Sequence, residues 1–250
     1  FNIIKSFTIN IISSEVTLAT NAGTGVTTAT FDGTSVANGT LINGTTKLQG
    51  ATVAIIQNYT TISGEAFQDA SGLTSVTIPA SVTSIGVMAF KSATNLATVS
   101  FEDITNSKLT NIYYGAFFGA TALTSITIPK SVTSIGASAF ESATGLTQVT
   151  FAPDISFGGI PGRMFFGATD LSSITIPNTV TSIGGEAFRN ASKLNTITFE
   201  ENSTLKIIGQ DSFRNTKIAS IEIPASVTTI ENGVFLWVTS LTSISFESVS

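Results

Sequence analysis

The sequence predicts a mainly β repeat solenoid of about eight stacked coils. The solenoid takes in the whole chain except its first part. Three observations support this prediction. An apolar pattern of Ile, then Phe five residues later, then Leu six residues after that recurs along the 250-residue chain. Short runs that alternate apolar and polar residues precede each recurrence, as is typical of β-strands. Repeats of this size bury their apolar residues only against neighbouring repeats, which is the arrangement of a solenoid.

The apolar pattern occurs eight times, with one residue lost before the last position of the seventh unit. The eight units are Ile62/Phe67/Leu73, Ile85/Phe90/Leu96, Ile112/Phe117/Leu123, Ile135/Phe140/Leu146, Ile160/Phe165/Leu171, Ile183/Phe188/Leu194, Ile208/Phe213/Ile218 and Ile230/Phe235/Leu241. Because each coil contributes one Phe at the same place, we expect these rings to form a buried ladder inside the solenoid.

One repeat, residues 123–144, illustrates the elements expected in each coil. Residues 125–128 alternate Ser, Ile, Thr, Ile, which predicts a short strand with its β-branched residues facing inward. Pro129 ends this strand because it has no N–H for a β-ladder. Residues 131–135 form a second short alternating run, and Gly136 is expected to permit a tight bend. Stacked copies pair equivalent strands about 4.8 Å apart in parallel sheets.

The spacing between the repeat Leu and the next repeat Ile alternates between short and long coils. It is 12 residues from Leu73 to Ile85 but 16 from Leu96 to Ile112, and this alternation continues. The structural unit is therefore expected to be a pair of coils, with the extra residues at one edge. Short coils carry Pro after the first strand; the long coils carry acids there, namely Glu102-Asp103, Asp154 and Glu200-Glu201, and Glu247 begins the next.

Residues 1–47 do not fit the repeat, and residues 48–250 form the predicted solenoid. Alternating runs within 7–11, 16–20 and 26–31 indicate strands in the first region. A terminal cap that covers the open edge of the first coil is one interpretation. A separate adhesive or anchoring element is the other.

Composition excludes several functional classes. The net charge is −5 and the pI is about 4.7, with Lys and Arg scattered singly, so nucleic acid is not an expected partner. Ser, Thr and Gly interrupt every apolar segment, so no membrane insertion is expected in this segment. The absence of Cys and His removes disulfides, thiolate nucleophiles and the usual Zn sites, and we predict no metal and no cofactor.

The repeat unit L-x-x-[IV]-x-I-P-x-S-V-T-S-I-G-x-x-A-F resembles the BspA-like leucine-rich repeat family, from about Leu48 to the C-terminus. The resemblance implies a leucine-rich-repeat solenoid with a parallel sheet on its concave side. It also implies a secreted or surface-displayed protein used in adhesion and protein binding, with no shared catalytic residues. The family often has Cys three residues before the repeat Leu; this chain has Ala70, Ala93, Ala120, Ala143, Ala168 and Ala191 there.

Paired carboxylates are the only candidates for catalysis. Glu102-Asp103 and Glu200-Glu201 are adjacent in sequence, whereas a glycosidase needs two carboxylates that converge across a cleft. Weak cation binding is a second interpretation, but no Asp-rich loop supplies the six or more oxygens that Ca²⁺ takes. We therefore interpret these residues as solvated loop acids and predict no catalytic residues and no enzyme activity.

The concave strand face is the predicted binding surface. Its outward residues are Ser75, Thr77, Thr98, Ser100, Ser125, Thr127, Gln148, Thr150, Ser173, Thr175, Thr196 and Thr198, continued by Ser220/Glu222 and Ser243/Ser245. These small polar residues also suit sheet propensity and solubility, so a purely structural reason for them stays open. Larger anchors are expected elsewhere, at Tyr113-Tyr114, Phe117-Phe118, Phe165-Phe166 and Trp237; Trp237 is either an exposed contact or part of a C-terminal cap.

An extracellular or cell-surface location is expected. The chain is rich in Ser and Thr, and it has N-glycosylation triplets at Asn38, Asn43, Asn58, Asn190 and Asn202, which would be used only on a secretory route. The first residue is Phe1 rather than Met, which we interpret as a processed or excised fragment whose export signal has been removed.

Three functions are consistent with the sequence. The first is a non-catalytic binding or adhesion module that recognises a protein or a glycan on another surface. The second is a structural spacer or fibre component that self-associates through the solenoid ends, because an open strand edge favours pairing. The third is binding to an ordered lattice such as ice or mineral, which the curvature of a concave sheet disfavours.

Overall fold

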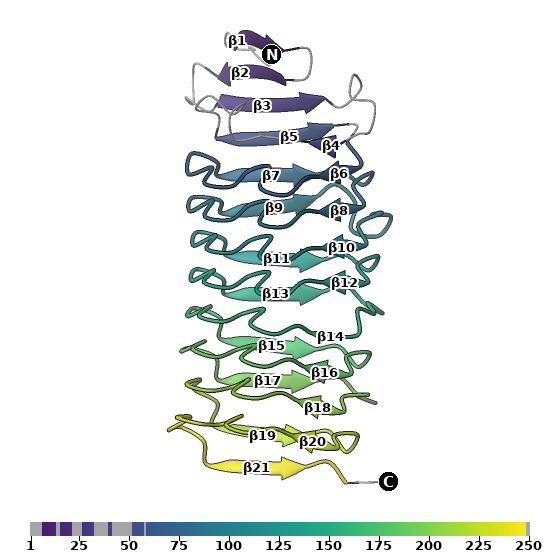
Figure 1. The fold of residues 1–250 in the computed structure, drawn as a ribbon, viewed down its shortest axis with the longest axis vertical. Coiled ribbons are helices and arrows are strands. Elements are labelled where there is room, and N and C mark those ends of the chain that lie inside the picture. The colour runs from purple at the N-terminus through teal and green to yellow at the C-terminus, as the bar shows by residue number, and fades with distance from the viewer. Residues whose placement is uncertain are drawn as a thin grey trace, which may run out of the picture.

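The computed structural model describes residues 52–57 and 59–248, and four strands before them. These four are β1 (Phe7–Ser13), β2 (Val16–Asn21), β3 (Thr27–Asp32) and β4 (Thr40–Leu41). The described chain is a rod of stacked coils, and no helix occurs in it (Figure 1). The predicted β-solenoid of about eight coils is thereby confirmed.

Each coil contributes one longer strand to one side of the rod. These strands are β5 (Val53–Gln57), β7 (Ser75–Ile78), β9 (Thr98–Phe101), β11 (Ser125–Ile128), β13 (Gln148–Phe151), β15 (Ser173–Ile176), β17 (Thr196–Phe199), β19 (Ser220–Ile223) and β21 (Ser243–Phe246). In most of them alternate residues are buried, as in β15, because one set of side chains faces the core and the other faces solvent.

A two-residue strand in each coil forms a second ladder on another side of the rod. These strands are β6 (Thr61–Ile62), β8 (Ser84–Ile85), β10 (Asn111–Ile112), β12 (Ser134–Ile135), β14 (Gly159–Ile160), β16 (Ser182–Ile183), β18 (Ile207–Ile208) and β20 (Thr229–Ile230). Each ends with the repeat Ile. Pairing within both sets is parallel and in register, as expected for stacked copies of one unit.

The ladder of longer strands is interrupted at regular intervals. Four residue pairs join β7 to β9, β11 to β13, β15 to β17 and β19 to β21. By contrast, one pair joins β9 to β11, and no ladder pair in the described chain joins β13 to β15 or β17 to β19. These interruptions follow β9, β13 and β17, the strands after which the long coils insert their extra residues. No such interruption follows β5, because three residue pairs join it to β7.

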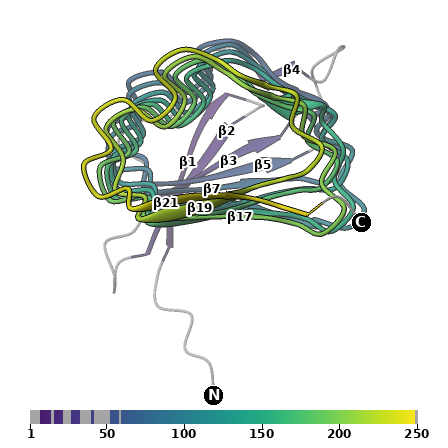
Figure 2. The same cartoon turned by 90° about the horizontal axis from the view of Figure 1, so that it is seen from below.

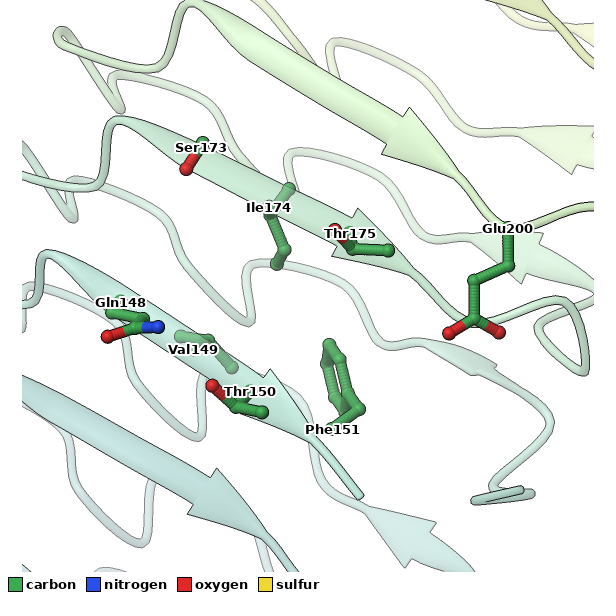
Figure 3. A pocket seen from close by; sticks show the side chains of 8 residues that line it. All are labelled: Gln148, Val149, Thr150, Phe151, Ser173, Ile174, Thr175 and Glu200. Atoms are coloured by element: carbon green, nitrogen blue, oxygen red, sulfur yellow. The ribbon is translucent and has the colours of Figure 1, made fainter. Parts of the chain in front are cut away.

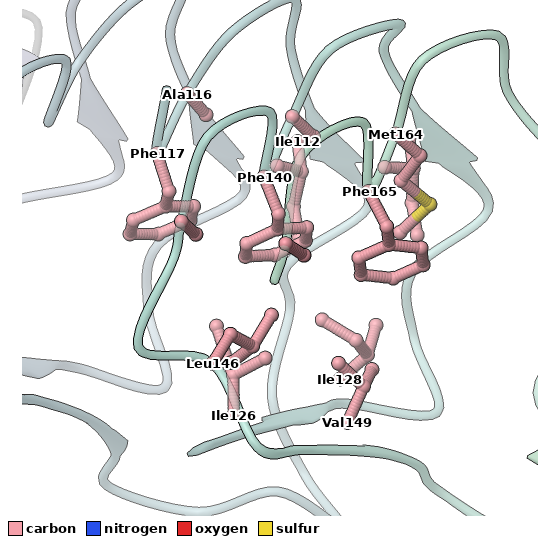
Figure 4. Close-up of a cluster of buried hydrophobic side chains, with 14 of the residues drawn as sticks. Ile112, Ala116, Phe117, Ile126, Ile128, Phe140, Leu146, Val149, Met164 and Phe165 are labelled. Carbon is pink, nitrogen blue, oxygen red and sulfur yellow. The ribbon is translucent and has the colours of Figure 1, made fainter. Parts of the chain in front are cut away.

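The core is dominated by a continuous ladder of phenylalanine rings. The rings of Phe67, Phe90, Phe117, Phe140, Phe165, Phe188, Phe213 and Phe235 stack in sequence with centroids 5.0–5.8 Å apart. Figure 4 shows three of these rings above the aliphatic side chains of Ile126, Ile128, Leu146 and Val149. The first seven rings are fully buried. The predicted ladder is therefore present.

The last unit departs from the predicted core. Ile230 is 41% exposed, and Phe235 and Leu241 are only partly buried. Every other repeat Ile, Phe and Leu is buried because coils pack on it from both sides. The last unit is covered from one side only by described residues, so its apolar side chains remain partly open.

Tight turns on the side opposite the longer strands use left-handed backbone at two places in every coil. These places are the third residue after the repeat Ile and the second after the repeat Phe, as at Ser138 and Ser142 with φ of 59° and 58°. Backbone N–H groups at these places donate to the next coil; Ser142, for example, donates to the carbonyl of Phe166 at 2.8 Å. This coil-to-coil bonding offsets the strain of non-glycine residues in that conformation.

Gly136 has a different reason from the predicted bend. Its φ is not in the left-handed region, and a Cβ atom on it would lie 2.3 Å from the backbone N of Tyr114 in the preceding coil. A glycine is needed because two backbones approach closely, not because the chain turns there.

The stack is nearly straight. Viewed along the long axis, successive coils almost superpose (Figure 2). The expected concavity of the strand face is therefore slight. Parallel ladders set the rise per coil on both the longer-strand and the shorter-strand sides, so neither side is much wider than the other. We call the side that carries the longer strands the strand face.

The strands before the repeats continue the same sheets. β1, β2 and β3 pair antiparallel, and β3 pairs in parallel with β5. β4 pairs with β6 in the ladder of short strands. The division of the chain near residue 47 and the capping role of the first region stay predictions.

Candidate binding surface

The strand face carries the side chains that the sequence placed outward. Ser75, Thr77 and Thr127 are partly buried, and the other nine of the twelve predicted residues are exposed. The residues between them, such as Ile126 and Val149, are buried in the core. Small hydroxyl groups thus line this face in register, and the outward positions of β7 to β21 include no aromatic or basic side chain.

One pair of neighbouring hydroxyls on the strand face interacts directly. Thr77 and Ser100, which lie opposite each other on β7 and β9, have their hydroxyl oxygens 3.1 Å apart. Such a pair partly satisfies its own hydrogen-bonding capacity. The opposite residues Thr127/Thr150 and Thr175/Thr198 also lie on intact strand pairs but show no such bond, so their hydroxyls stay free for a ligand.

A groove of about 200 Å³ lies where the ladder is interrupted between β13 and β15. Gln148, Thr150 and Phe151 of β13 line it, with Ser173 and Thr175 of β15 and Glu200 of the next coil (Figure 3). Four of the twelve predicted binding residues therefore gather around one depression. Sequence reasoning placed these four on the face but did not predict the groove.

The acids after the long-coil strands have structural partners. Glu102, Glu200 and Glu247 each accept a hydrogen bond from a backbone N–H of the preceding coil, at 3.2, 3.0 and 3.1 Å. The donors are Ala80, Asn178 and Ala225, each the residue after a strand-ending Pro. These carboxylates therefore join the two coils of a pair, a role that goes beyond the solvated loop acids expected from the sequence.

Asp103 and Asp154 also bind within the protein. The Asp103 carboxylate accepts hydrogen bonds from the hydroxyl and backbone N–H of Thr105 and from the amide and backbone N–H of Asn106. The bond from the Thr105 side chain, followed by those from Asn106, holds the pKa of Asp103 well below its usual range. Asp154 forms an exposed ion pair with Lys130 at 3.0 Å.

The side of the rod that carries the tight turns, which we call the turn side, has a network of charged residues that the sequence did not predict. Arg163 donates to both oxygens of Glu141 and to Glu186, and its guanidinium lies 4.0 Å above the ring of Phe166. The bonds to Glu141 raise the pKa of Arg163 above its usual value. Arg189 pairs with Glu186 as well. A sequence signal exists, since Glu141 and Arg163 lie one coil apart in equivalent turns.

A second, shallower groove of about 320 Å³ adjoins this network. Ala137, Gly162, Gly185 and Gln210 line it together with Arg163 and Glu186. The charged groups at its edge are paired with each other or with Glu141 and Arg189. The network stabilises neighbouring coils and leaves this groove without an unpaired charge at its edge.

The predicted aromatic anchors divide into buried and exposed residues. Phe117 and Phe165 are buried in the ring ladder, Phe118 and Phe166 are partly buried, and Tyr113 and Tyr114 are 46% and 45% exposed. Trp237 is 62% exposed, with the Arg214 guanidinium 4.0 Å above its ring. Trp237 is therefore exposed, and both interpretations, a contact residue or part of a C-terminal cap, stay predictions.

Comparison with known proteins agrees with this architecture. Residues 41–159 and 158–250 match the BspA type leucine-rich repeat region, in six copies. The chain belongs to the BspA-type leucine-rich repeat family. The likeness predicted from the repeat unit is thereby confirmed, and the family is a class of repeat proteins that is generally non-catalytic. No curated protein matches the sequence.

Solved structures show the same fold at low identity. This BspA-type chain is similar to a leucine-rich repeat protein from Bacteroides ovatus, with TM-score 0.59, 24% identity and coverage of 98% of this chain and 64% of the other. It is also similar to a T. pallidum leucine-rich repeat protein, with TM-score 0.56, 19% identity and coverage of 81% and 87%. The pneumococcal vaccine antigen PcpA gives TM-score 0.56, 18% identity and coverage of 97% and 82%. The chain thus spans under two thirds of the Bacteroides ovatus protein.

The described part of the BspA-type chain contains neither a candidate membrane-spanning helix nor a candidate metal cluster. No helix there is long and apolar enough to cross a membrane. No group of three or more acidic side chains is placed there to hold a metal ion. Asn202 is exposed, whereas Asn190 is partly buried and its side-chain oxygen accepts a hydrogen bond from Asn215. Asn38, Asn43 and Asn58 lie outside the described residues.

Proposed function

We propose that this chain is a non-catalytic binding module of a secreted or surface-displayed protein, which recognises protein or glycan through its strand face. The observation that carries the proposal is the register of the outward hydroxyl and amide side chains within the strand pairs β7–β9, β11–β13 and β15–β17. Membership of the BspA-type family supports an extracellular or cell-surface location.

The chemistry of the strand face favours many weak contacts. Aromatic and Arg side chains, which commonly dominate binding energy at protein interfaces, are absent from its outward positions on β7 to β21. Hydroxyl and amide groups instead bind through hydrogen bonds of modest net strength. Affinity therefore has to be summed over several coils, which an elongated and rigid stack makes possible.

A binding screen tests the proposal. The purified chain is presented to a panel of immobilised glycans and extracellular proteins, alongside three variants. Thr150→Lys and Thr198→Lys place a charged side chain on the strand face, and Gln210→Lys places one on the turn side as the matched control. We expect at least one ligand to bind the parent chain and the control but not the strand-face variants. Loss of binding only in the turn-side variant would contradict the proposed face.

Self-association is a second candidate function, favoured by one observation. The last described coil exposes apolar side chains: Leu236, Trp237, Ile244 and Phe246 are 43%, 62%, 43% and 65% exposed. A second copy could cover them by strand pairing along β21. Sedimentation over a range of concentrations tests this function, and the double variant Ile244→Ser/Phe246→Ser should abolish any dimer. A monomer at every concentration excludes it.

Lattice binding receives less support than either of these functions. The slight curvature of the stack removes the argument from a bent sheet (Figure 2). However, matching a lattice needs a regular array of hydroxyls, and the ladder is interrupted between β13 and β15 and between β17 and β19. A measurement of thermal hysteresis that shows no effect would exclude the ice-binding form of this function.

A further inference from the structure

The groove between β13 and β15 combines a hollow with unused hydrogen-bonding groups. The side chains of Gln148, Thr150, Ser173 and Thr175 make no hydrogen bond with other described residues. Elsewhere on the face, Thr77 and Ser100 of the β7–β9 pair use their hydroxyls to bond to each other. The groove therefore has four neutral polar side chains without partners, all turned toward the same hollow (Figure 3).

One end of the groove combines an acceptor with an aromatic ring. Glu200 uses Oε2 to accept the backbone N–H of Asn178, which fixes the carboxylate and leaves Oε1 free of partners among the described residues. Phe151 lies at the same end (Figure 3), and its ring stacks on that of buried Phe157 with centroids 5.3 Å apart. Both groups are thus held in place before any ligand arrives, which lowers the entropy cost of binding.

This lining selects the chemical class of the ligand. A hydroxyl-rich neutral molecule can donate to Glu200 and exchange hydrogen bonds with the amide and the three hydroxyls. Its apolar face can pack against Phe151, in the way that ligand sites combine apolar surface with a few placed polar groups. An anion would meet the Glu200 carboxylate and no Lys or Arg on the lining. The groove therefore favours a neutral sugar over a phosphate, a sulfate or an acidic sugar.

Size limits the ligand to a single ring. The volume of about 200 Å³ is below the roughly 300 Å³ at which pockets for drug-sized ligands begin. We propose that the groove between β13 and β15 is a subsite for one neutral sugar residue of a glycan, with Gln148, Thr150, Ser173, Thr175 and Glu200 as hydrogen-bonding groups and Phe151 as the packing surface. The proposal rests on the proposed function of the strand face and assigns its glycan-binding position.

Titration with simple sugars tests the subsite on the full chain. The probes are the methyl glycosides of glucose, galactose, mannose and N-acetylglucosamine, and N-acetylneuraminic acid serves as the acidic probe. Amide chemical shifts are followed by NMR. We expect at least one neutral glycoside to bind with millimolar affinity and to shift the amides of β13 and β15. The acidic sugar should cause no shift at the same concentration.

Two variants and a matched control locate the binding. Gln148→Ala and Thr150→Val remove exposed polar groups from the groove without touching the core, and each should weaken binding of the responding glycoside at least tenfold. Thr198→Val makes the same change on β17 and should leave binding within twofold. Binding that survives both groove variants, or that responds only to Thr198→Val, would overturn the subsite.

The remaining outcomes separate the subsite from the function on which it rests. If no neutral sugar shifts β13 or β15 while a protein ligand from the screen is lost in Thr150→Lys and Thr198→Lys, the strand face is a binding surface but the groove is not a sugar subsite. If only N-acetylneuraminic acid binds in the groove, the inferred preference for neutral sugars is wrong. If sugars bind the groove and no larger ligand is found, the subsite stands without the wider function.

Discussion

Phe140 and Phe165 stack with their ring centroids 5.7 Å apart at the level where both strand ladders are interrupted. The longer-strand ladder stops between β13 and β15, and the shorter-strand ladder stops between β12 and β14. At this level the rod is held by the ring ladder and by turn hydrogen bonds, such as that from the Phe140 N–H to the Met164 carbonyl at 2.9 Å. The core therefore provides continuity where the sheets do not.

Truncation of Phe140 should accordingly be costly. Phe140→Ala removes a fully buried ring between two others, and we expect it to lower the free energy of unfolding by about 3–5 kcal/mol, as measured by denaturant titration. Thr127→Ala, at an outward position of β11, should change it by about 0.5 kcal/mol or slightly more through lost strand propensity.

Hydrogen exchange extends this test to the neighbouring coils. Because coupling between neighbours dominates the stability of repeat proteins, Phe140→Ala should also lower amide protection around Phe117 and Phe165. Loss of protection confined to one coil would argue against a coupled ladder. A greater effect of Thr127→Ala than of Phe140→Ala would mean that the inward and outward faces have been exchanged.

Substitution of Gly136 tests the close approach of neighbouring coils. A Cβ on residue 136 would lie 2.3 Å from the backbone N of Tyr114, so Gly136→Ala should destabilise the fold by at least about 1–3 kcal/mol. Gly185 is the matched control, because its Cβ would meet only the Gln210 carbonyl at an ordinary 3.5 Å. Gly185→Ala should be neutral or stabilise by up to about 1 kcal/mol. Thermal unfolding of both variants tests whether close approach is the reason for Gly136. Equal effects of the two substitutions would contradict it.

The core could be predicted from the sequence because each coil repeats the same local pattern. The spacing of Ile135, Phe140 and Leu146 indicates which residues face inward, and seven other units repeat this indication. The reason for Gly136 could not be found within one repeat, since the clash that it avoids involves Tyr114 in the preceding coil. Aligning successive units would place Gly136 beside Tyr113, the residue before Tyr114.

The groove was less predictable than the outward direction of its residues. Alternation in 148–151 and 173–176 was enough to place Gln148 and Thr175 on the strand face. Whether β13 pairs with β15 depends on how a long coil and a short coil pack on each other. No single residue in the sequence determines this pairing. The alternating spacing of the coils indicated only that neighbouring coils would differ in pairs.

Asp103 offers a prediction on pH dependence. Its hydrogen bonds hold its pKa well below the usual value of about 3.9, so its carboxylate should still be ionised at pH 3 in an NMR titration. A depressed pKa in the folded state contributes stability that is present above the ordinary pKa and is lost as the pH falls through the lower, folded-state value. Thr105→Val removes the largest cause and should raise the pKa of Asp103 toward the ordinary value. An unchanged titration in Thr105→Val would show that the side-chain bond is not the cause.

The network around Arg163 should stabilise the rod more than the exposed ion pair between Lys130 and Asp154. The Glu141 side chain is only 9% exposed, so Arg163→Ala leaves a largely buried carboxylate without its main partner. We expect a loss of about 1–3 kcal/mol in the free energy of unfolding. Lys130→Ala breaks a pair whose side chains are 56% and 81% exposed, and it should cost less than about 1 kcal/mol.

A double-mutant cycle separates the Arg163–Glu141 interaction from the packing of Arg163 on Phe166. Because removing both partners of a buried bond costs less than orphaning one, Glu141→Ala/Arg163→Ala should be less destabilised than the sum of the two single variants. The interaction should also survive moderate salt better than the Lys130–Asp154 pair, since partly buried charges are less screened. Strictly additive single variants would mean that Arg163 acts through its contact with the Phe166 ring, 4.0 Å below its guanidinium, and not through Glu141.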